Sequence, residues 1–328
     1  MKKLRLPYID QLKGLDIILV VFGHVSKFSG DNIGVCNKYI SLFRMSLFFL
    51  LSGLVVSLQY QKNWTEKTKY LLKKLQVILI PFFAWGVFRE LSTGNSYLDF
   101  LLDFNKDGYW FLWILFEFYI FQVLFDSLSA LINIKKKIIV DLIFLLIAFI
   151  ALKIGYHFIS DTVNNFLGYL YWINNLPFFM AGVIIKKYDL TQKLFTSNLL
   201  FVFALAVIFG FSIYDIDFAN KNMILAFFIV IIIFSFFYKL STSHNWITDK
   251  LSYIGQSTLS IYVMHYFLID YIHIESIMKI LVESRNILAE AALLIVISSS
   301  ICLVCILAEQ LLKQNKYLSR IFLGKVDN

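Results

Sequence analysis

The stretch KGLDIILVVFGHV, residues 13–25, decides the fold class, because it places a lysine and a histidine in an otherwise apolar segment. On an α-helix the eleven steps from Lys13 to His24 return to within about 20° of the start and cover roughly 16 Å along the axis. With Lys13 at the membrane boundary, His24 lies about halfway across a hydrocarbon core roughly 30 Å thick. Ionisable groups inside a bilayer are costly and mark functional sites, so this pair is a functional candidate.

The composition indicates many such helices, because 59% of the residues are hydrophobic and the mean hydropathy is +0.73. The first apolar segment carries Asp16 and His24 and lacks a small-residue cleavage site, so we expect it to be retained. We predict an all-α polytopic membrane protein of about ten transmembrane helices. The expected spans are roughly 12–30, 39–60, 71–91, 109–132, 138–158, 166–186, 194–213, 221–240, 251–273 and 287–312.

The distribution of charge predicts the topology of these spans. The two termini and the loops on their side hold 21 of the lysines and arginines, against eight in the opposite loops and their flanks. Positive residues concentrate on the cytoplasmic side, so we expect both termini there. We further expect a multi-pass protein of a cell membrane, of bacterial origin. The basic residues flank helices and face anionic lipid, which gives nucleic-acid binding no support. We expect one domain over residues 1–328, without an appended soluble domain.

Three further polar residues are expected at the depth of His24. Arg44, Glu117 and His265 all fall roughly 8 to 13 Å below the outer surface of their spans. Each also has a structural interpretation. Arg44 and Glu117 can form an ion pair that holds two helices together, and His265 can make a hydrogen bond between helices. As a catalytic set, His24 is the general base, Glu117 orients it, and Arg44 stabilises negative charge on a reacting carbonyl or binds the acceptor.

A second group of candidates lies nearer the cytoplasmic side. Ser52 and Gly53 are small enough to admit a slender ligand, although a notch for helix packing explains them as well. Lys13 on the same side suits a phosphate-bearing ligand. These residues suggest a route from the cytoplasm to mid-membrane. No metal is expected.

Five segments, in order along the chain, resemble motifs of the integral-membrane acyltransferase-3 family, and the first is especially similar to its fucose O-acetylase-like branch. They are Tyr8–His24, Phe43–Gly53, Trp110–Trp113, Leu176–Gly182 and Ser260–His265. The resemblance implies transfer of an acyl group, usually acetyl, from cytoplasmic acyl-coenzyme A to a hydroxyl of an envelope glycan or glycolipid.

The resemblance also implies roles for single residues. His24 matches the family's catalytic histidine, Lys13 its donor-handling residue, and Trp110, Tyr262 and His265 become candidates for substrate binding. Two positions depart from the pattern: Ser46 stands where proline is common, and Asp16 stands where a small or apolar residue is usual. The role of Asp16 stays open.

Two functions explain buried charge in such a bundle. For acyl transfer, a neutral histidine suits the activation of a sugar hydroxyl, and direct transfer is favoured over an acyl-enzyme on Ser52, which lacks an obvious neighbouring base. The alternative is a ten-helix exporter of a charged or sugar-linked solute, which also buries charge in a central cavity. Scarce broken helices and the lack of an internal repeat weigh against the exporter.

Overall fold

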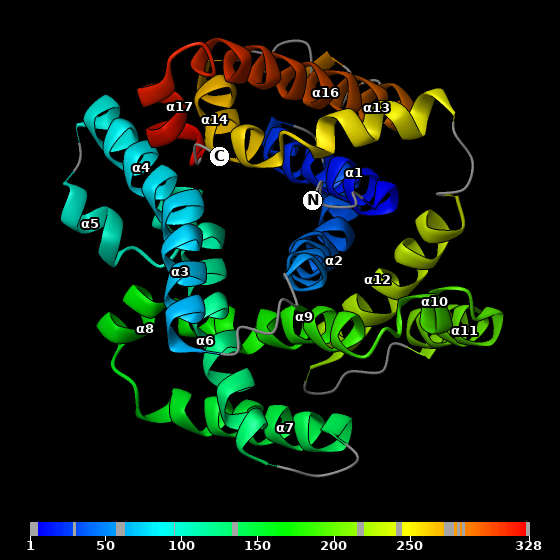
Figure 1. Cartoon of the computed structure of the whole chain (residues 1–328). Coiled ribbons are helices and arrows are strands. Elements are labelled where there is room, and N and C mark those ends of the chain that lie inside the picture. The colour runs from blue at the N-terminus through cyan, green and yellow to red at the C-terminus, as the bar shows by residue number, and fades with distance from the viewer. Residues whose placement is uncertain are drawn as a thin grey trace. The chain divides into compact units, whose positions relative to one another are not determined.

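The computed structural model (Figure 1) describes residues 6–28, 31–56, 63–94, 96–132, 137–214, 220–240, 245–271, 279–280, 283 and 286–325. Every regular element among them is a helix, and the described part of the chain contains no strand. The predicted all-α class is therefore confirmed.

The chain divides into two compact units, and the single domain over residues 1–328 stays a prediction. The first unit comprises residues 1–51 and 190–310, and the second comprises residues 52–189 and 311–328. Helices mainly of the first unit are α1 (Pro7–Val25), α2 (Asp31–Val55), α10 (Thr191–Phe195), α11 (Asn198–Tyr214), α12 (Lys221–Leu240), α13 (Trp246–Gly255), α14 (Thr258–Tyr271) and α16 (Ile287–Leu312). Those of the second are α3 (Trp64–Lys74), the π-helical η2 (Leu75–Leu79), α4 (Ile80–Thr93), α5 (Tyr97–Leu102), α6 (Trp110–Leu131), α7 (Lys137–Gly155), α8 (Asp161–Leu167), α9 (Tyr169–Lys187) and α17 (Lys316–Leu323).

Seven segments of the described chain are helices long and apolar enough to cross a membrane. They are Asn37–Val55, Trp64–Thr93, Trp110–Leu131, Lys137–Phe158, Asp161–Lys187, Lys221–Leu240 and Ile287–Leu312, and each overlaps an expected span. The other three expected spans also form helices but differ from a simple apolar crossing, so the count of ten and the cytoplasmic termini stay predictions.

Each of those three differs for a local reason. The helix α1 carries Asp10, Lys13 and Asp16, which lower its hydropathy. The apolar helix α11 has 17 residues and is shorter than a typical crossing. The segment expected as one span at 251–273 is interrupted at Gln256 and Ser257, where α13 ends and α14 begins.

Two glycines bring α1 and α13 into backbone contact within the first unit (Figure 1). A Cβ atom on Gly14 would lie 1.9 Å from the Leu251 carbonyl oxygen, and one on Gly255 would lie 1.8 Å from the Asp10 carbonyl oxygen. No larger residue fits at either position, because backbone cannot retreat as a flexible side chain can. This crossing holds α1 against α13 at Gly14, the residue after Lys13. It therefore also holds in place the helix that carries His24.

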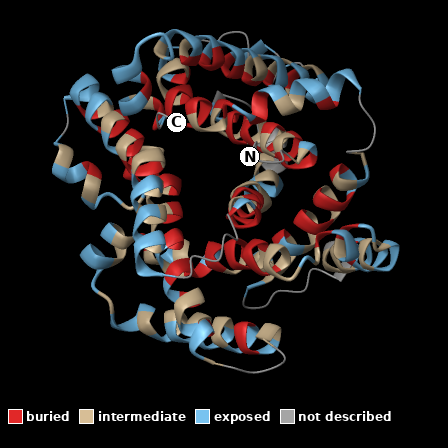
Figure 2. Ribbon diagram, viewed as in Figure 1, coloured by how far each residue is buried: buried red, intermediate tan, exposed pale blue. Residues whose placement is uncertain are grey.

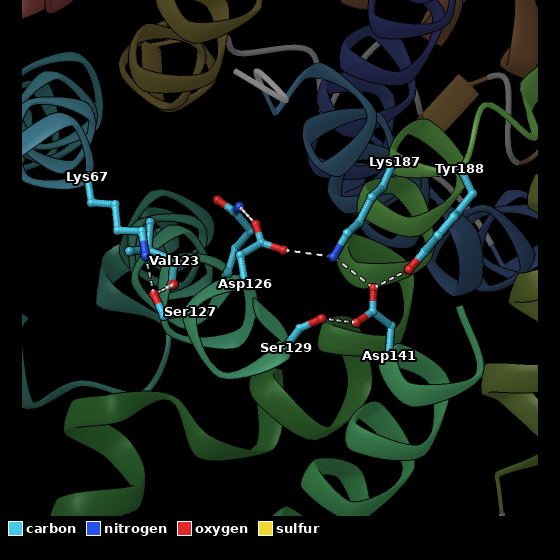
Figure 3. Close-up of polar contacts among 9 residues, drawn as sticks. Lys67, Val123, Asp126, Ser127, Ser129, Asp141, Lys187 and Tyr188 are labelled. Atoms are coloured by element: carbon cyan, nitrogen blue, oxygen red, sulfur yellow. Dashed lines mark hydrogen bonds and ion pairs between the residues drawn. The ribbon is translucent and has the colours of Figure 1, made fainter. Parts of the chain in front are cut away.

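A buried ion cluster ties α7 to α6 and α9 in the second unit (Figure 3). The Lys187 Nζ atom lies 2.8 Å from Asp141 Oδ2 and 3.2 Å from Asp126 Oδ1. The wholly buried Asp141 also accepts hydrogen bonds from Ser129 Oγ at 2.5 Å and Tyr188 OH at 2.8 Å. Most of α7 is exposed or intermediate, with Val140 and Asp141 as its buried residues (Figure 2). The cluster therefore anchors a helix that has little other buried surface.

Candidate active site

His24, in the last turn of α1, contacts α14 through Tyr266. The distance from the Tyr266 hydroxyl oxygen to His24 Nε2 is 3.0 Å, and the two ring centroids lie 4.7 Å apart. Both side chains are half-buried. His24 is thus held by a hydrogen bond while its ring stays partly accessible.

His265 lies beside this pair, with its ring centroid 5.3 Å from that of His24 and 4.2 Å from that of Tyr266. Its Nδ1 atom is 3.0 Å from the carbonyl oxygen of Ile261, one turn earlier in α14. A carbonyl oxygen only accepts, so Nδ1 carries the proton. His265 is wholly buried, which favours the hydrogen-bonding interpretation over direct substrate contact, and its role in substrate binding stays a prediction.

Arg44, on α2, lies against the surface of α1 at Gly23. A Cβ atom on Gly23 would lie 1.5 Å from Arg44 Nη1, so the absence of a side chain makes the space for the guanidinium. Arg44 Nη1 also approaches the Leu19 carbonyl oxygen at 3.5 Å. Its charge interacts with Tyr266, Asp16 and Tyr262. The structure therefore brings Arg44, His24 and His265 together within the first unit.

Asp16 is wholly buried, and neither of its carboxylate oxygens has a hydrogen-bond partner among the described residues. Arg44 is the charged group that acts on it electrostatically. Leaving a buried acceptor unsatisfied costs about 1–3 kcal/mol, and more when it is charged. Asp16 therefore belongs to the polar surroundings of Arg44, and its role stays open.

Glu117 lies in the second unit, and its described hydrogen bond is with a residue of that unit. Its Oε2 atom accepts from Trp172 Nε1 at 2.6 Å. The two residues line a pocket of about 280 Å³ whose other walls are mostly apolar. Within the first unit, the described hydrogen bond to His24 comes from Tyr266. The assignment of Glu117 as the residue that orients His24 stays a prediction.

A buried lysine lies close in sequence to the helix that carries Glu117. Lys106 donates to the carbonyl oxygens of Asp103 at 2.7 Å and Asn165 at 2.8 Å. Burial lowers the pKa of Lys106 to about 8, while Asp103 and Glu117 act in the opposite direction. This lysine links the loop before α6 to α8 and contributes positive charge near Glu117.

The remaining predicted site residues have structural neighbours of their own. Trp110 stacks on Tyr171, with ring centroids 3.7 Å apart and an angle of 6° between the planes, so one face of its ring is covered. A Cβ atom on Gly53 would lie 2.0 Å from the Phe179 carbonyl oxygen, which makes Gly53 a close-packing position against α9.

Three more candidates complete the set. Tyr262 is buried, with its ring centroid 6.1 Å from that of His265. Ser52 is half-buried beside Gly53, and Lys13 is half-buried next to the crossing at Gly14. It stays a prediction that Lys13, Ser52 and Gly53 bind the donor. It also stays a prediction that Tyr262 and Trp110 bind the substrate.

Comparison with protein families matches residues 6–309 to the acyltransferase domain. The chain belongs to the acyltransferase-3 family. The match begins just before α1 and ends within α16, so it includes the His24 cluster as well as Glu117 and Trp110. No curated protein and no solved structure matches the chain. Membership of the fucose O-acetylase-like branch stays a prediction.

For an acyltransferase-3 protein, the chemically useful groups of the first unit are an imidazole, a phenol and a guanidinium. The imidazole exchanges protons near neutral pH, and the guanidinium stabilises negative charge. Among the described residues no group of three or more histidine, cysteine, aspartate or glutamate side chains is placed to hold a metal ion. Tyr266 is the member of this set that sequence reasoning missed.

Proposed function

We propose that this protein moves an acyl group, most simply acetyl, from cytoplasmic acyl-coenzyme A to a hydroxyl of a cell-surface or envelope glycan or glycolipid. One observation carries the proposal. In a chain of the acyltransferase-3 family, the half-buried His24 and Arg44 lie beside the buried Asp16 and His265. A base and a cation side by side are what acyl transfer to a poor nucleophile requires.

In the proposed reaction, His24 removes the proton of the acceptor hydroxyl as its oxygen attacks the thioester carbonyl carbon. Negative charge develops on the carbonyl oxygen, and Arg44 stabilises it. The carbon–sulfur bond then breaks and coenzyme A leaves as the thiolate. Glu117 belongs to the proposal as a catalytic carboxylate, and Lys13 as a point charge for a donor phosphate. Direct transfer is proposed because the described hydrogen bond of His24 is with the Tyr266 phenol.

A solute exporter is the second candidate, because the break between α13 and α14 is the kind of interruption found at transporter binding sites. Family membership favours the enzyme. Purified protein incubated with acetyl-coenzyme A separates the two, since an acyltransferase slowly releases free coenzyme A with water as acceptor. Thiol release by the wild type that is lost in His24→Ala supports the enzyme. Equal thiol release with and without the protein refutes it.

A further inference from the structure

Tyr266 lies at the atom of His24 that the proposed reaction uses. On α1, Nε2 is the ring nitrogen farther from the backbone, and it lies 3.0 Å from the Tyr266 hydroxyl oxygen. A neutral imidazole has one donor nitrogen and one acceptor nitrogen. When the phenol donates to Nε2, that nitrogen is the basic one, and the Tyr266 hydroxyl already occupies the position from which a substrate hydroxyl would give its proton.

The surroundings of Tyr266 hold the phenol in that position. Its ring lies 4.7 Å from the His24 centroid and 4.2 Å from the His265 centroid. The helix α14 that carries it packs against α1, and the charge of Arg44 acts on its hydroxyl. An acceptor that displaced the phenol would have to disturb all these contacts, whereas one that hydrogen-bonds to the phenol disturbs none of them.

Exposure is compatible with the same arrangement. Tyr266 is half-buried, as are His24 and Arg44, while His265 and Asp16 are wholly buried. Of the polar groups around His24, the phenol is thus one that an entering hydroxyl can reach.

We propose that Tyr266 is a catalytic residue that relays the acceptor's proton to His24 Nε2, an inference that rests on the proposed acyl transfer. As the acceptor oxygen attacks the carbonyl carbon, its proton passes to the Tyr266 oxygen, and the phenolic proton passes to His24 Nε2. The new carbon–oxygen bond forms and the carbon–sulfur bond breaks, leaving its electron pair on sulfur. The imidazolium proton then returns through the Tyr266 hydroxyl to the thiolate, so the protein ends as it began.

The test uses the full-length purified protein, acetyl-coenzyme A and water as the acceptor, with thiol release as the signal. Tyr266→Phe keeps the ring and removes the hydroxyl. We expect kcat to fall on the order of 10²-fold, within the range of general acid–base catalysis, while KM for acetyl-coenzyme A is retained. Tyr271→Phe is the matched control, because Tyr271 lies on the same helix, is 82% exposed, and is outside the His24 cluster.

A solvent isotope measurement distinguishes a relay from a structural role. Two protons moving together make kcat of the wild type depend on the deuterium fraction of the solvent along a curve, and Tyr266→Phe should give a straight line. A straight line for the wild type, or wild-type kcat in Tyr266→Phe, overturns the relay. A wild type that releases no coenzyme A overturns the proposed function and the relay with it, whereas an active wild type with an equally active Tyr266→Phe overturns the relay alone.

Discussion

Gly23→Ala tests whether the position of Arg44 beside His24 matters for activity. The added Cβ atom would lie 1.5 Å from Arg44 Nη1 and 2.7 Å from its Cζ, whereas ordinary van der Waals contact begins at 3.4 Å. The guanidinium must therefore retreat by roughly 2 Å, since the Cβ is fixed by the helix. That displacement separates Arg44 from the Leu19 carbonyl oxygen and from the reacting groups near His24.

We expect Gly23→Ala to change thermal stability little and to lower the rate strongly. The obstructing atoms belong to the end of a flexible side chain, and alanine favours a helix over glycine by about 0.5–1 kcal/mol, so the melting temperature should change little. A misplacement of about 1 Å in a catalytic group costs on the order of 10²-fold in rate, so we expect at least that loss in kcat for thiol release.

The matched control is Gly210→Ala, because Gly210 also lies in a helix but an added Cβ would meet nothing within 4 Å. This variant should keep the wild-type rate, with a melting temperature equal to or slightly above that of the wild type, since alanine favours a helix over glycine by about 0.5–1 kcal/mol. Gly23→Ala with a wild-type rate would refute the assignment of Arg44 to the reaction. A large loss of thermal stability in Gly23→Ala would instead show that the guanidinium cannot move, contrary to the argument from side-chain flexibility.

The remaining predictions address the base, the ion cluster and the topology. His24→Ala should insert normally yet lose at least ~10²-fold in kcat, because the variant lacks the imidazole that hydrogen-bonds to Tyr266 and acts as the proposed base; normal turnover would remove His24 from the mechanism. Asp141→Asn should lower the free energy of unfolding by about 1–3 kcal/mol, since Lys187 loses its nearer carboxylate but keeps Asp126. Its control, Asp270→Asn, breaks an ion pair of 4.0 Å between half-exposed groups and should cost under about 1 kcal/mol; equal shifts in thermal denaturation would contradict the buried cluster. An impermeant thiol reagent outside intact cells should label a cysteine introduced at the exposed Asp103 above the background of the native cysteines, and spare one at Lys136, which lies outside the described residues; the reverse pattern would overturn the topology.

The sequence predicts how far each residue lies along its span, because each helical residue advances about 1.5 Å along the axis. That arithmetic puts Arg44, Glu117 and His265 level with His24. The structure brings Arg44 and His265 to His24 within the first unit, whereas Glu117 belongs to the second. Rotation about each axis and the choice of neighbouring helix could not be predicted in this way. Tyr266 follows His265 by one residue and so points about 100° away from it, which gave no signal that both rings would contact His24.

The interruption between α13 and α14 was missed for a related reason. Residues 251–273 are apolar enough to suggest one span. Hydropathy contains no information on where the backbone of one helix contacts that of another. Gly255 and Gly14 were available as signals, but a glycine in an apolar segment also fits ordinary helix packing. The backbone contact that requires both glycines appears only once the two helices are placed against each other.

Two wholly buried carboxylates show how the two units use charge differently. Asp141 has its partners from Lys187, Ser129 and Tyr188, so its charge is compensated where it lies and serves to hold helices together. Asp16 has no hydrogen-bond partner among the described residues, and Arg44 is the charged group that acts on it. An unsatisfied buried carboxylate is a net cost to folding, so packing alone does not account for it. Asp16 lies on α1 between Lys13 and His24. The unfavourable free energy of burying it is therefore borne by the helix that carries both the proposed donor-binding lysine and the proposed base.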